Sequence, residues 1–216
     1  VCIIARDSKI VTSINEHRFN PRLKYAVFNE NVSATADLNE ANNMDYLFVT
    51  LPSQKIRDVL SKVDLSNKNQ EIIIASKGIE IESCCFLSDI VQEITKNENI
   101  NILSGPCFSE EVSQNLPTAV TFASQSKKSF DNINTLFHNK NFRVYYSDDL
   151  IGCQIGGALK NIYAIAAGIT LGLNLGENAK SALITRSFVE ITRFGEAMGA
   201  KKQTIFGLSG LGDLML

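Results

Sequence analysis

The segment Glu71-Ile72-Ile73-Ile74-Ala75-Ser76-Lys77-Gly78 decides the fold expected for the first two thirds of this 216-residue chain. Its apolar residues follow one another without polar interruption, which is typical of a strand covered on both faces. Strands of this kind belong to parallel sheets that have helices packed on either side. The segment therefore predicts a buried strand over 71–75 that ends in a turn carrying Lys77.

Similar apolar runs alternate with helical patterns along the same part of the chain. Further strands are expected at 1–5, 45–50, 101–103, 118–123 and 142–146. Helices are expected between them at 8–17, 54–62, 84–95 and 128–138. Alternation of this kind predicts an α/β fold with a parallel sheet.

The character of the sequence changes near Ser147. Ser147-Asp148-Asp149 suits the start of a helix, and from there to Ala200 the pattern is helical throughout. A Gly- and Asn-rich break at 173–178 separates two long helices, the second over 181–198. The stretch 150–176 has Lys160 as its only charge. Its glycines and central lysine disfavour a membrane span, so we expect a buried helix with one unusual charge.

Both ends of the chain look cut inside a larger architecture. The first strand of a dinucleotide-binding sheet carries a G-x-G-x-x-G turn, and this sequence contains none. The run 1–5, followed by Arg6-Asp7, instead predicts the second strand, whose end reads the adenosine ribose. We therefore expect the central first strand to be missing, and the 216 residues alone to bind NADPH poorly, to be inactive, and to be either unstable or rescued by association through open strand edges. The alternative is that terminal segments of the intact protein are simply not part of this sequence.

Composition excludes several classes of function. A net charge of −2 gives no electrostatic footprint for nucleic acid or an anionic membrane. Only two histidines occur, far apart, which excludes a histidine-rich metal site and disfavours a Ser-His-Asp hydrolase. Five cysteines without a C-x-x-C pattern indicate reduced thiols in a cytosolic protein rather than a disulfide framework or a zinc ribbon. No signal peptide is visible.

Two lysines are the strongest candidates for chemistry. Lys160 lies in an otherwise uncharged helix behind the pair Gly156-Gly157, which lets a neighbour approach closely. Desolvation lowers a lysine pKa and suits proton transfer, although a lysine at the helix rim with a solvated tip is equally open. Lys77 follows a parallel strand, where ligand crevices form, and could attract a phosphate or polarise a carbonyl. On position alone, an ordinary turn lysine is the better interpretation of Lys77.

Weaker candidates lie in two loops. Gly105 permits an unusual backbone in Ser104-Gly105-Pro106-Cys107-Phe108-Ser109, whose helix start could face an anion or cofactor. Asp213, in a glycine-rich loop, could pair with a buried lysine or simply cap a helix. Cys107 has no base suggested nearby that would make it a nucleophile.

Together the motifs resemble the bacterial NAD(P)-dependent glycerol-3-phosphate dehydrogenase family. The resemblance runs over nearly the whole chain, and its order and spacing are more specific than any single motif. The matching stretches are Leu51-Pro52-Ser53, Ala75-Ser76-Lys77-Gly78, Ser104-Gly105-Pro106-x-Phe108, Leu116-Pro117-Thr118-Ala119, Phe142-Arg143-Val144-Tyr145, Gln154-x-Gly156-Gly157-Ala158-x-Lys160-Asn161, Ala179-x-x-Ala182-Leu183-Ile184-Thr185-Arg186 and Gly210-Leu211-Gly212-Asp213-Leu214.

The resemblance implies a Rossmann-type dinucleotide-binding domain over 1–147, lacking its first strand, and a helical substrate domain over 148–216. It implies reversible reduction of dihydroxyacetone phosphate to sn-glycerol 3-phosphate for phospholipid synthesis, with NADP or NAD as cofactor. Lys160 matches the proton donor and acceptor. Substrate-binding positions are Lys77, Gly105, Cys107, Lys160 and Asp213, and cofactor-binding positions are Arg6, Lys77 and Ser109. No metal is implied.

Two alternatives stay open. A β-hydroxyacid dehydrogenase of the same superfamily also has a lysine on the first helix after the cofactor domain. That family usually places Asn four residues after the lysine, whereas Asn161 follows Lys160 directly. A non-catalytic fragment is the other alternative. We further expect a cytoplasmic protein with a small-molecule substrate, no nucleic-acid partner, no membrane insertion and possible homodimerisation.

Overall fold

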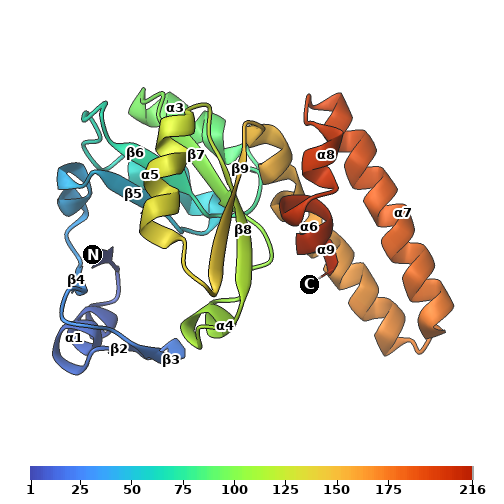
Figure 1. Ribbon diagram of the computed structural model, residues 1–216, viewed down its shortest axis with the longest axis horizontal. Helices are drawn as coiled ribbons and strands as arrows, with labels where there is room; N and C mark the ends of the chain where they lie inside the picture. The colour runs from blue at the N-terminus through green and yellow to red at the C-terminus, as the bar shows by residue number, and fades with distance from the viewer. Residues whose placement is uncertain (216) are drawn as a thin grey trace.

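The computed structural model describes residues 1–215, apart from the side chain of Lys24, as an α/β part followed by a helical part (Figure 1). The strands are β1 Cys2–Ile4, β2 Phe19–Asn20, β3 Leu23–Val27, β4 Ser33–Thr35, β5 Tyr46–Val49, β6 Glu71–Ile74, β7 Ile100–Ser104, β8 Thr118–Ala123 and β9 Phe142–Ser147. The α-helices are α1 Ser8–His17, α2 Ile56–Leu60, α3 Leu87–Thr95, α4 Ser109–Ser113, α5 Lys127–Phe137, α6 Leu150–Gly172, α7 Gly176–Ala197, α8 Lys202–Ile205 and α9 Asp213–Met215. The expected strands and helices are present, with ends that differ by a few residues.

The main sheet has the strand order β5-β6-β7-β8-β9. Strands β5, β6 and β7 run parallel, with Phe48 opposite Ile73 and Ile73 opposite Asn101, and β8 and β9 are parallel to each other. The β7–β8 pair is antiparallel, with Leu103 opposite Phe122. The Rossmann-type sheet is thus confirmed, with one reversal at β8, where only the short helix α4 connects two adjacent strands.

Strand β6 shows why its sequence is continuously apolar. Ile72, Ile73 and Ile74 are each 0% exposed. Ile72 and Ile74 belong to the core formed with α2 and α3, whereas Ile73 belongs to the core formed with α5 on the other face. Because successive side chains of a strand point to opposite faces, only a strand covered on both sides requires apolar residues at every position.

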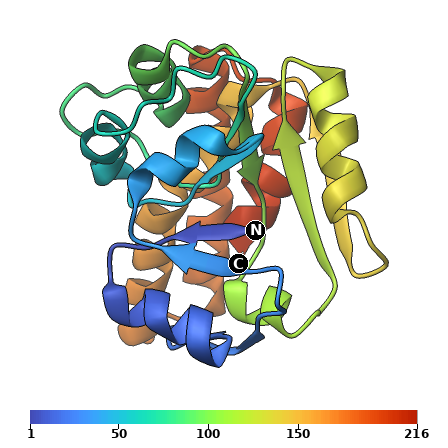
Figure 2. The same cartoon turned by 90° about the vertical axis from the view of Figure 1, so that its left-hand side faces the viewer.

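The first strand of the chain is separate from this sheet. β1 pairs in parallel with β4, Ile3 lying opposite Ala34, and neither strand is hydrogen-bonded to the five-stranded sheet. Figure 2 shows this pair of blue strands set apart from β5. β1 is therefore not a neighbour of β5, and its place as the second strand of a dinucleotide-binding sheet stays a prediction. The hairpin β2–β3 and strand β4 were not expected, since these short segments carry little apolar periodicity.

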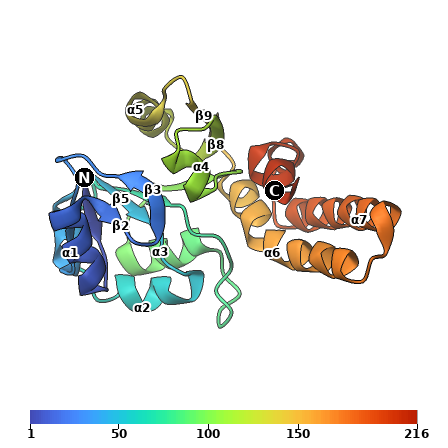
Figure 3. The same ribbon diagram turned by 90° about the horizontal axis from the view of Figure 1, so that it is seen from below.

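The helical part is built on an antiparallel hairpin of α6 and α7 (Figures 1 and 3). Asp149 is buried and caps α6, accepting from the Gly152 N–H at 2.8 Å and from the Lys201 N–H at 2.7 Å. The break is shorter than predicted, and α7 begins at Gly176 rather than near 181. Asn174 and Gly176 both have positive φ, which allows so tight a connection.

The expectation that the whole 150–176 stretch is buried is wrong. Burial along α6 is confined to Gly152–Gly157, and Ile162, Ile165 and Ile169 are 60%, 66% and 55% exposed. Nothing in the described part of the chain covers that face. By length and composition α6 could cross a membrane, but the core helix of a soluble protein passes the same test.

Candidate active site

Lys77 is positioned by the carboxyl ends of β5 and β6. The Ser76 hydroxyl donates to the carbonyls of Leu51 at 2.6 Å and Val49 at 3.2 Å, tying the two strand ends together. Gly78 has φ +137°, and a Cβ there would lie 2.7 Å from Ser53 Oγ. The chain therefore turns sharply after Lys77 and leaves this residue beyond the carboxyl ends of the strands, the edge at which α/β sheets bind ligands.

The segment that follows Lys77 is anchored by side chains. Gln54 Nε2 donates to the Ile79 carbonyl at 2.7 Å, and Gln54 Oε1 accepts from the Ile81 N–H at 3.0 Å. Arg57 Nε lies 2.9 Å from the Glu80 carboxylate, and Arg57 Nη1 lies 3.0 Å from that of Glu93. Hydrogen bonds from Arg57 and Ser83 hold the pKa of the largely buried Glu80 below its ordinary value of 4.5.

Lys160 extends from α6 just beyond the buried stretch of that helix. Its side chain is only 16% exposed, and its Nζ lies 5.5 Å from the centroid of the Phe108 ring. The ring supplies a cation–π contact on one side of the ammonium. Sequence reasoning did not single out Phe108, whose only signal was its place in the Ser104–Phe108 motif.

Asp213 reaches Lys160 because glycines allow the backbone of the preceding turn to pack closely on neighbouring helices. The π-helical turn η3, Leu208–Gly212, packs against α6. A Cβ on Gly156 would lie 1.7 Å from the Ser209 carbonyl oxygen, and one on Gly210 would lie 2.0 Å from the Ile205 carbonyl oxygen. Only glycine at these two positions permits so close an approach, which delivers Asp213 to the side of α6.

The carboxylate of Asp213 joins both lysines. Its Oδ1 accepts from Lys160 Nζ at 3.0 Å, and its Oδ2 accepts from Lys77 Nζ. The Asp213 side chain is 0% exposed, whereas that of Lys77 is 35% exposed. The expected pairing of Asp213 with Lys160 is present, and the sharing of the carboxylate with Lys77 is new.

The cluster of Asp213, Lys77 and Lys160 carries a net positive charge. One buried carboxylate balances one of the two ammonium groups, so a positive charge remains where both lysines reach solvent. A buried carboxylate requires such partners, since an unpaired ion in the interior costs several kcal/mol (about 3–5 when one partner of a buried pair is removed). The excess charge favours an anionic group, either a phosphate or an oxyanion that develops on a carbonyl.

The loop after β7 forms a neighbouring wall. Gly105 has φ +137°, and a Cβ there would lie 3.2 Å from Val120 Cα and 3.7 Å from Leu208 Cβ. Cys107 is an exposed free cysteine. Desolvation raises the pKa of its thiol, although nearby Lys77 acts in the opposite direction. A raised pKa disfavours the thiolate, so the geometry gives Cys107 no role as a nucleophile.

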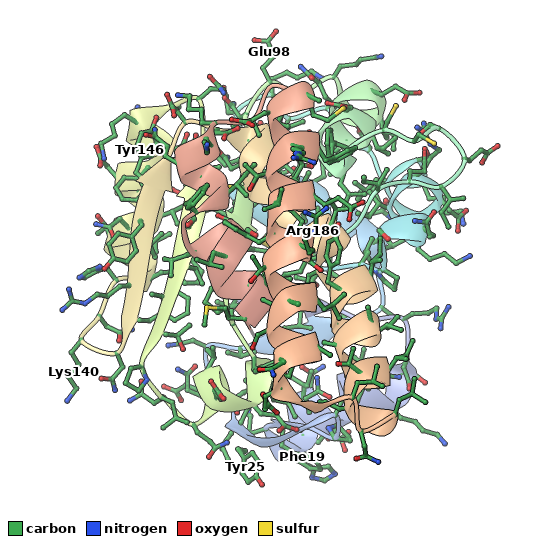
Figure 4. The ribbon with its side chains drawn as sticks, turned by 90° about the vertical axis from the view of Figure 1, so that its right-hand side faces the viewer. Phe19, Tyr25, Glu98, Lys140, Tyr146 and Arg186 are labelled. Atoms are coloured by element: carbon green, nitrogen blue, oxygen red, sulfur yellow. The ribbon has the colours of Figure 1, made fainter. Side chains whose placement is uncertain are left out.

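The remaining predicted positions lie outside the lysine cluster. Ser109 is the exposed first residue of α4, which packs against β3. Arg6 is exposed just after β1, next to Asp7, whose side chain caps α1. The described residues show no contact that brings Arg6 or Ser109 to Asp213. Arg186, which was not predicted as a site residue and appears only in the motif over 179–186, is exposed on α7, the helix at the front of Figure 4.

These features fit parts of a nicotinamide dinucleotide site. Arg6 at the end of β1 suits a ribose phosphate, and the loops after β6 and β7 carry Lys77 and Gly105 at the carboxyl ends of the strands, where dinucleotides bind in sheets of this type. The Ser104 hydroxyl at the end of β7 is buried without a hydrogen-bond partner in the described structure. No cluster of His, Cys, Asp and Glu among residues 1–215 could hold a metal ion.

A Rossmann-type domain, followed by a helical domain that contributes a lysine to the strand ends, defines the class of dinucleotide-dependent dehydrogenases. Within it, the profile of the NAD-dependent glycerol-3-phosphate dehydrogenase N-terminus matches residues 1–130, and that of the C-terminus matches 149–216. The chain belongs to the NAD(P)-dependent glycerol-3-phosphate dehydrogenase family. This assignment decides against the β-hydroxyacid dehydrogenase alternative.

Individual relatives agree. A Novosphingobium aromaticivorans protein named glycerol-3-phosphate dehydrogenase [NAD(P)+] is 42% identical over 218 residues, which cover 100% of this chain and 65% of that protein. The Bacillus subtilis protein of that name is 42% identical and matched over 64% of its length. The crystal structure of glycerol-3-phosphate dehydrogenase from Coxiella burnetii superposes with a TM-score of 0.90 at 34% identity, covering 100% of this chain and 67% of that one. The chain thus spans about 65% of the first of these relatives.

The Arg57–Glu80 pair predicts a pH-dependent contribution to stability. Since the folded-state pKa of Glu80 is depressed, the contribution is present above its ordinary value of 4.5 and is lost as pH falls through the lower folded value. Glu80→Gln should therefore lower the urea midpoint at pH 7, and the gap to the wild type should close below pH 4.5. The exposed Glu98, which projects from the surface in Figure 4, provides the control Glu98→Gln. An unchanged gap at pH 3.5 would contradict the assignment.

Proposed function

We propose that this chain forms the reductive site of an enzyme that interconverts dihydroxyacetone phosphate and sn-glycerol 3-phosphate, with NADP or NAD, for phospholipid synthesis. The observation that carries the proposal is the shared carboxylate of Asp213, which holds two ammonium groups at the strand ends. The substrate is a small anion with a reactive carbonyl. The cluster offers a proton donor and a surplus positive charge to such a molecule.

Lys160 donates the proton. A nicotinamide cofactor, when bound, would supply the hydride for the carbonyl carbon, and the carbonyl oxygen, which gains negative charge, would require a proton. The Lys160 ammonium, sheltered by Phe108 and fixed by Asp213, is the group best placed to donate it. In the reverse direction the neutral amine accepts the alcohol proton.

Lys77 and Asp213 complete the substrate site. The more exposed Lys77 attracts the phosphate or the developing oxyanion, and Asp213 orients both lysines. Gly105 and Cys107 contact the substrate from the loop after β7. Ser109 and Lys77 contact the cofactor, and Arg6 contacts its ribose end. We place the domain boundary at 147/148, since Asp149 caps the first long helix.

The cofactor preference is assigned to Arg6. An acid at this strand end binds the ribose diol of NAD, whereas an arginine accommodates the 2′-phosphate of NADP. Asp7 follows directly, so both cofactors are accepted, with a bias toward NADP.

The protein is proposed to be a cytoplasmic homodimer that neither inserts into a membrane nor binds nucleic acid. Five free cysteines suit a reducing compartment, and the chain carries no basic excess. Exposed apolar residues gather on α6 and the α6–α7 connection, among them Ile162, Ile165, Ile169, Leu171, Leu173 and Leu175. Patches of this kind mark association surfaces.

Replacing Lys160 tests the catalytic assignment. The assay measures NADPH-dependent reduction of dihydroxyacetone phosphate by the 216 residues and by a chimera that adds the terminal segments of the Novosphingobium relative. The chimera should be active, and Lys160→Ala should lower its turnover about 10²-fold or more, the usual scale for a general acid. The exposed Lys128 provides the control Lys128→Ala, which should change nothing. An inactive, folded chimera would favour a non-catalytic fragment, and normal turnover of Lys160→Ala would reject the role of Lys160.

Arg6 is tested by affinity. In the chimera, Arg6→Asp should weaken NADPH binding more than NADH binding, since it removes the partner of the 2′-phosphate. Fluorescence titration of each cofactor measures both dissociation constants. Equal weakening of the two would show that Arg6 is only a surface charge.

The association surface is tested by sedimentation equilibrium. The chimera should sediment as a dimer, and Ile165→Glu, on the exposed face of α6, should shift it to a monomer because it places a charge in an apolar interface. The exposed Leu136→Glu on α5 provides the control and should stay dimeric. A monomeric wild-type chimera would contradict the proposal.

A further inference from the structure

The two adjacent glycines of α6 have different neighbours. A Cβ on Gly156 would meet backbone, the Ser209 carbonyl, at 1.7 Å. The three atoms nearest to a Cβ on Gly157 would all belong to the side chain of Lys77, at 3.0 Å for Cγ, 3.1 Å for Cδ and 3.4 Å for Cβ. The missing side chain of Gly156 therefore allows η3 to pack on the helix. The missing side chain of Gly157 instead leaves the space that the Lys77 side chain fills.

We infer that Gly157 is a positioning residue for the proposed reaction, which sets the path of the Lys77 side chain across α6 to the Asp213 carboxylate. The stem of Lys77 starts at the end of β6, passes over Gly157 and ends with its Nζ on Asp213 Oδ2. Carbon atoms pack at about 3.5–4.0 Å, so a methyl group at Gly157 is too close to Cγ and Cδ of this stem.

A methyl group at Gly157 would displace the lysine rather than the helix. Backbone cannot yield without breaking the interlock of α6 and η3, but a lysine stem has several rotatable bonds and 35% of the side chain is exposed. Lys77 would then shift by a few tenths of an ångström and its contact with Oδ2 would be weakened. Lys160 binds the other oxygen, Oδ1, and would stay.

The two lysines therefore differ in their dependence on one glycine. Since Lys160 delivers the proton and Lys77 attracts the anion, a methyl group at Gly157 should impair substrate binding more than proton transfer. A purely structural role would instead reduce stability whether or not Lys77 is present.

A double-mutant cycle on thermal stability tests the geometry without any assay of activity. Gly168 lies on the same helix, and a Cβ added there would meet nothing within 4 Å, so Gly168→Ala reports only the helix preference of alanine. Gly168→Ala should raise the unfolding midpoint in both the wild-type and the Lys77→Ala backgrounds. Gly157→Ala should lower the midpoint in the wild type and raise it in Lys77→Ala, where the two closest atoms, Cγ and Cδ, are gone and Cβ of residue 77 lies at an ordinary 3.4 Å. A lowered midpoint in both backgrounds would overturn the inference.

The same double-mutant cycle, measured by steady-state kinetics of the chimera, tests the expected effect on substrate binding. This effect rests on the proposed function. Gly157→Ala should raise the KM for dihydroxyacetone phosphate about tenfold, within the range that misplacement of a site group produces, with a smaller change in kcat. Added to Lys77→Ala, it should have no further effect, and Gly168→Ala should leave both constants unchanged. If Gly157→Ala raises the KM by the same factor in the wild-type and the Lys77→Ala backgrounds, the inference is overturned. An inactive chimera would reject the proposed function, while the stability cycle would still decide the role of Gly157.

Discussion

The carboxylate of Asp213 is the interaction on which the rest of the site depends. It is fully buried and binds one lysine from the end of a β-strand and one from a long helix. An ion removed from water is tolerated only when it is paired, so the fold must bring both lysines to it. The same pairing leaves a net positive charge at the strand ends, since one carboxylate faces two ammonium groups. It also joins the α/β part of the chain to the helical part.

Glycine makes this arrangement sterically possible. Gly156 allows η3 to lie directly on α6, Gly210 allows η3 to lie against the end of α8, and Gly78 turns the chain after Lys77. Gly157 leaves room for the stem of Lys77, and Gly105 lets the loop after β7 approach β8. These residues contribute no chemistry, yet each removes a side chain from a point where backbone or a functional group must pass. These five glycines therefore mark close approaches on which the architecture around the site depends.

Much of the fold could be predicted from the sequence, because strands covered on both faces, such as Ile72–Ile74, leave a local signal. Lys160 was also recognisable, as a charge isolated in an apolar helix. The reversal of β8 and the short hairpin β2–β3 were not, since pairing direction depends on tertiary contacts. The bridge from Lys77 to Asp213 spans 136 residues of sequence, and no local pattern encodes it. The burial of the whole helix α6 was predicted wrongly. Apolar composition indicates that a helix face favours burial, but it does not show whether another element packs on that face.

The central claim is that one carboxylate holds both lysines at once, and NMR of the lysine ammonium groups tests it most directly. Hydrogen-bonded, shielded ammonium groups exchange slowly with water and give resolved ¹⁵N signals. Two such signals are expected at neutral pH, assigned to Lys77 and Lys160 by substitution. Both should disappear or shift together in Asp213→Asn, while the signals of surface lysines stay unchanged. A response of only one of the two lysines, or of neither, would contradict the claim.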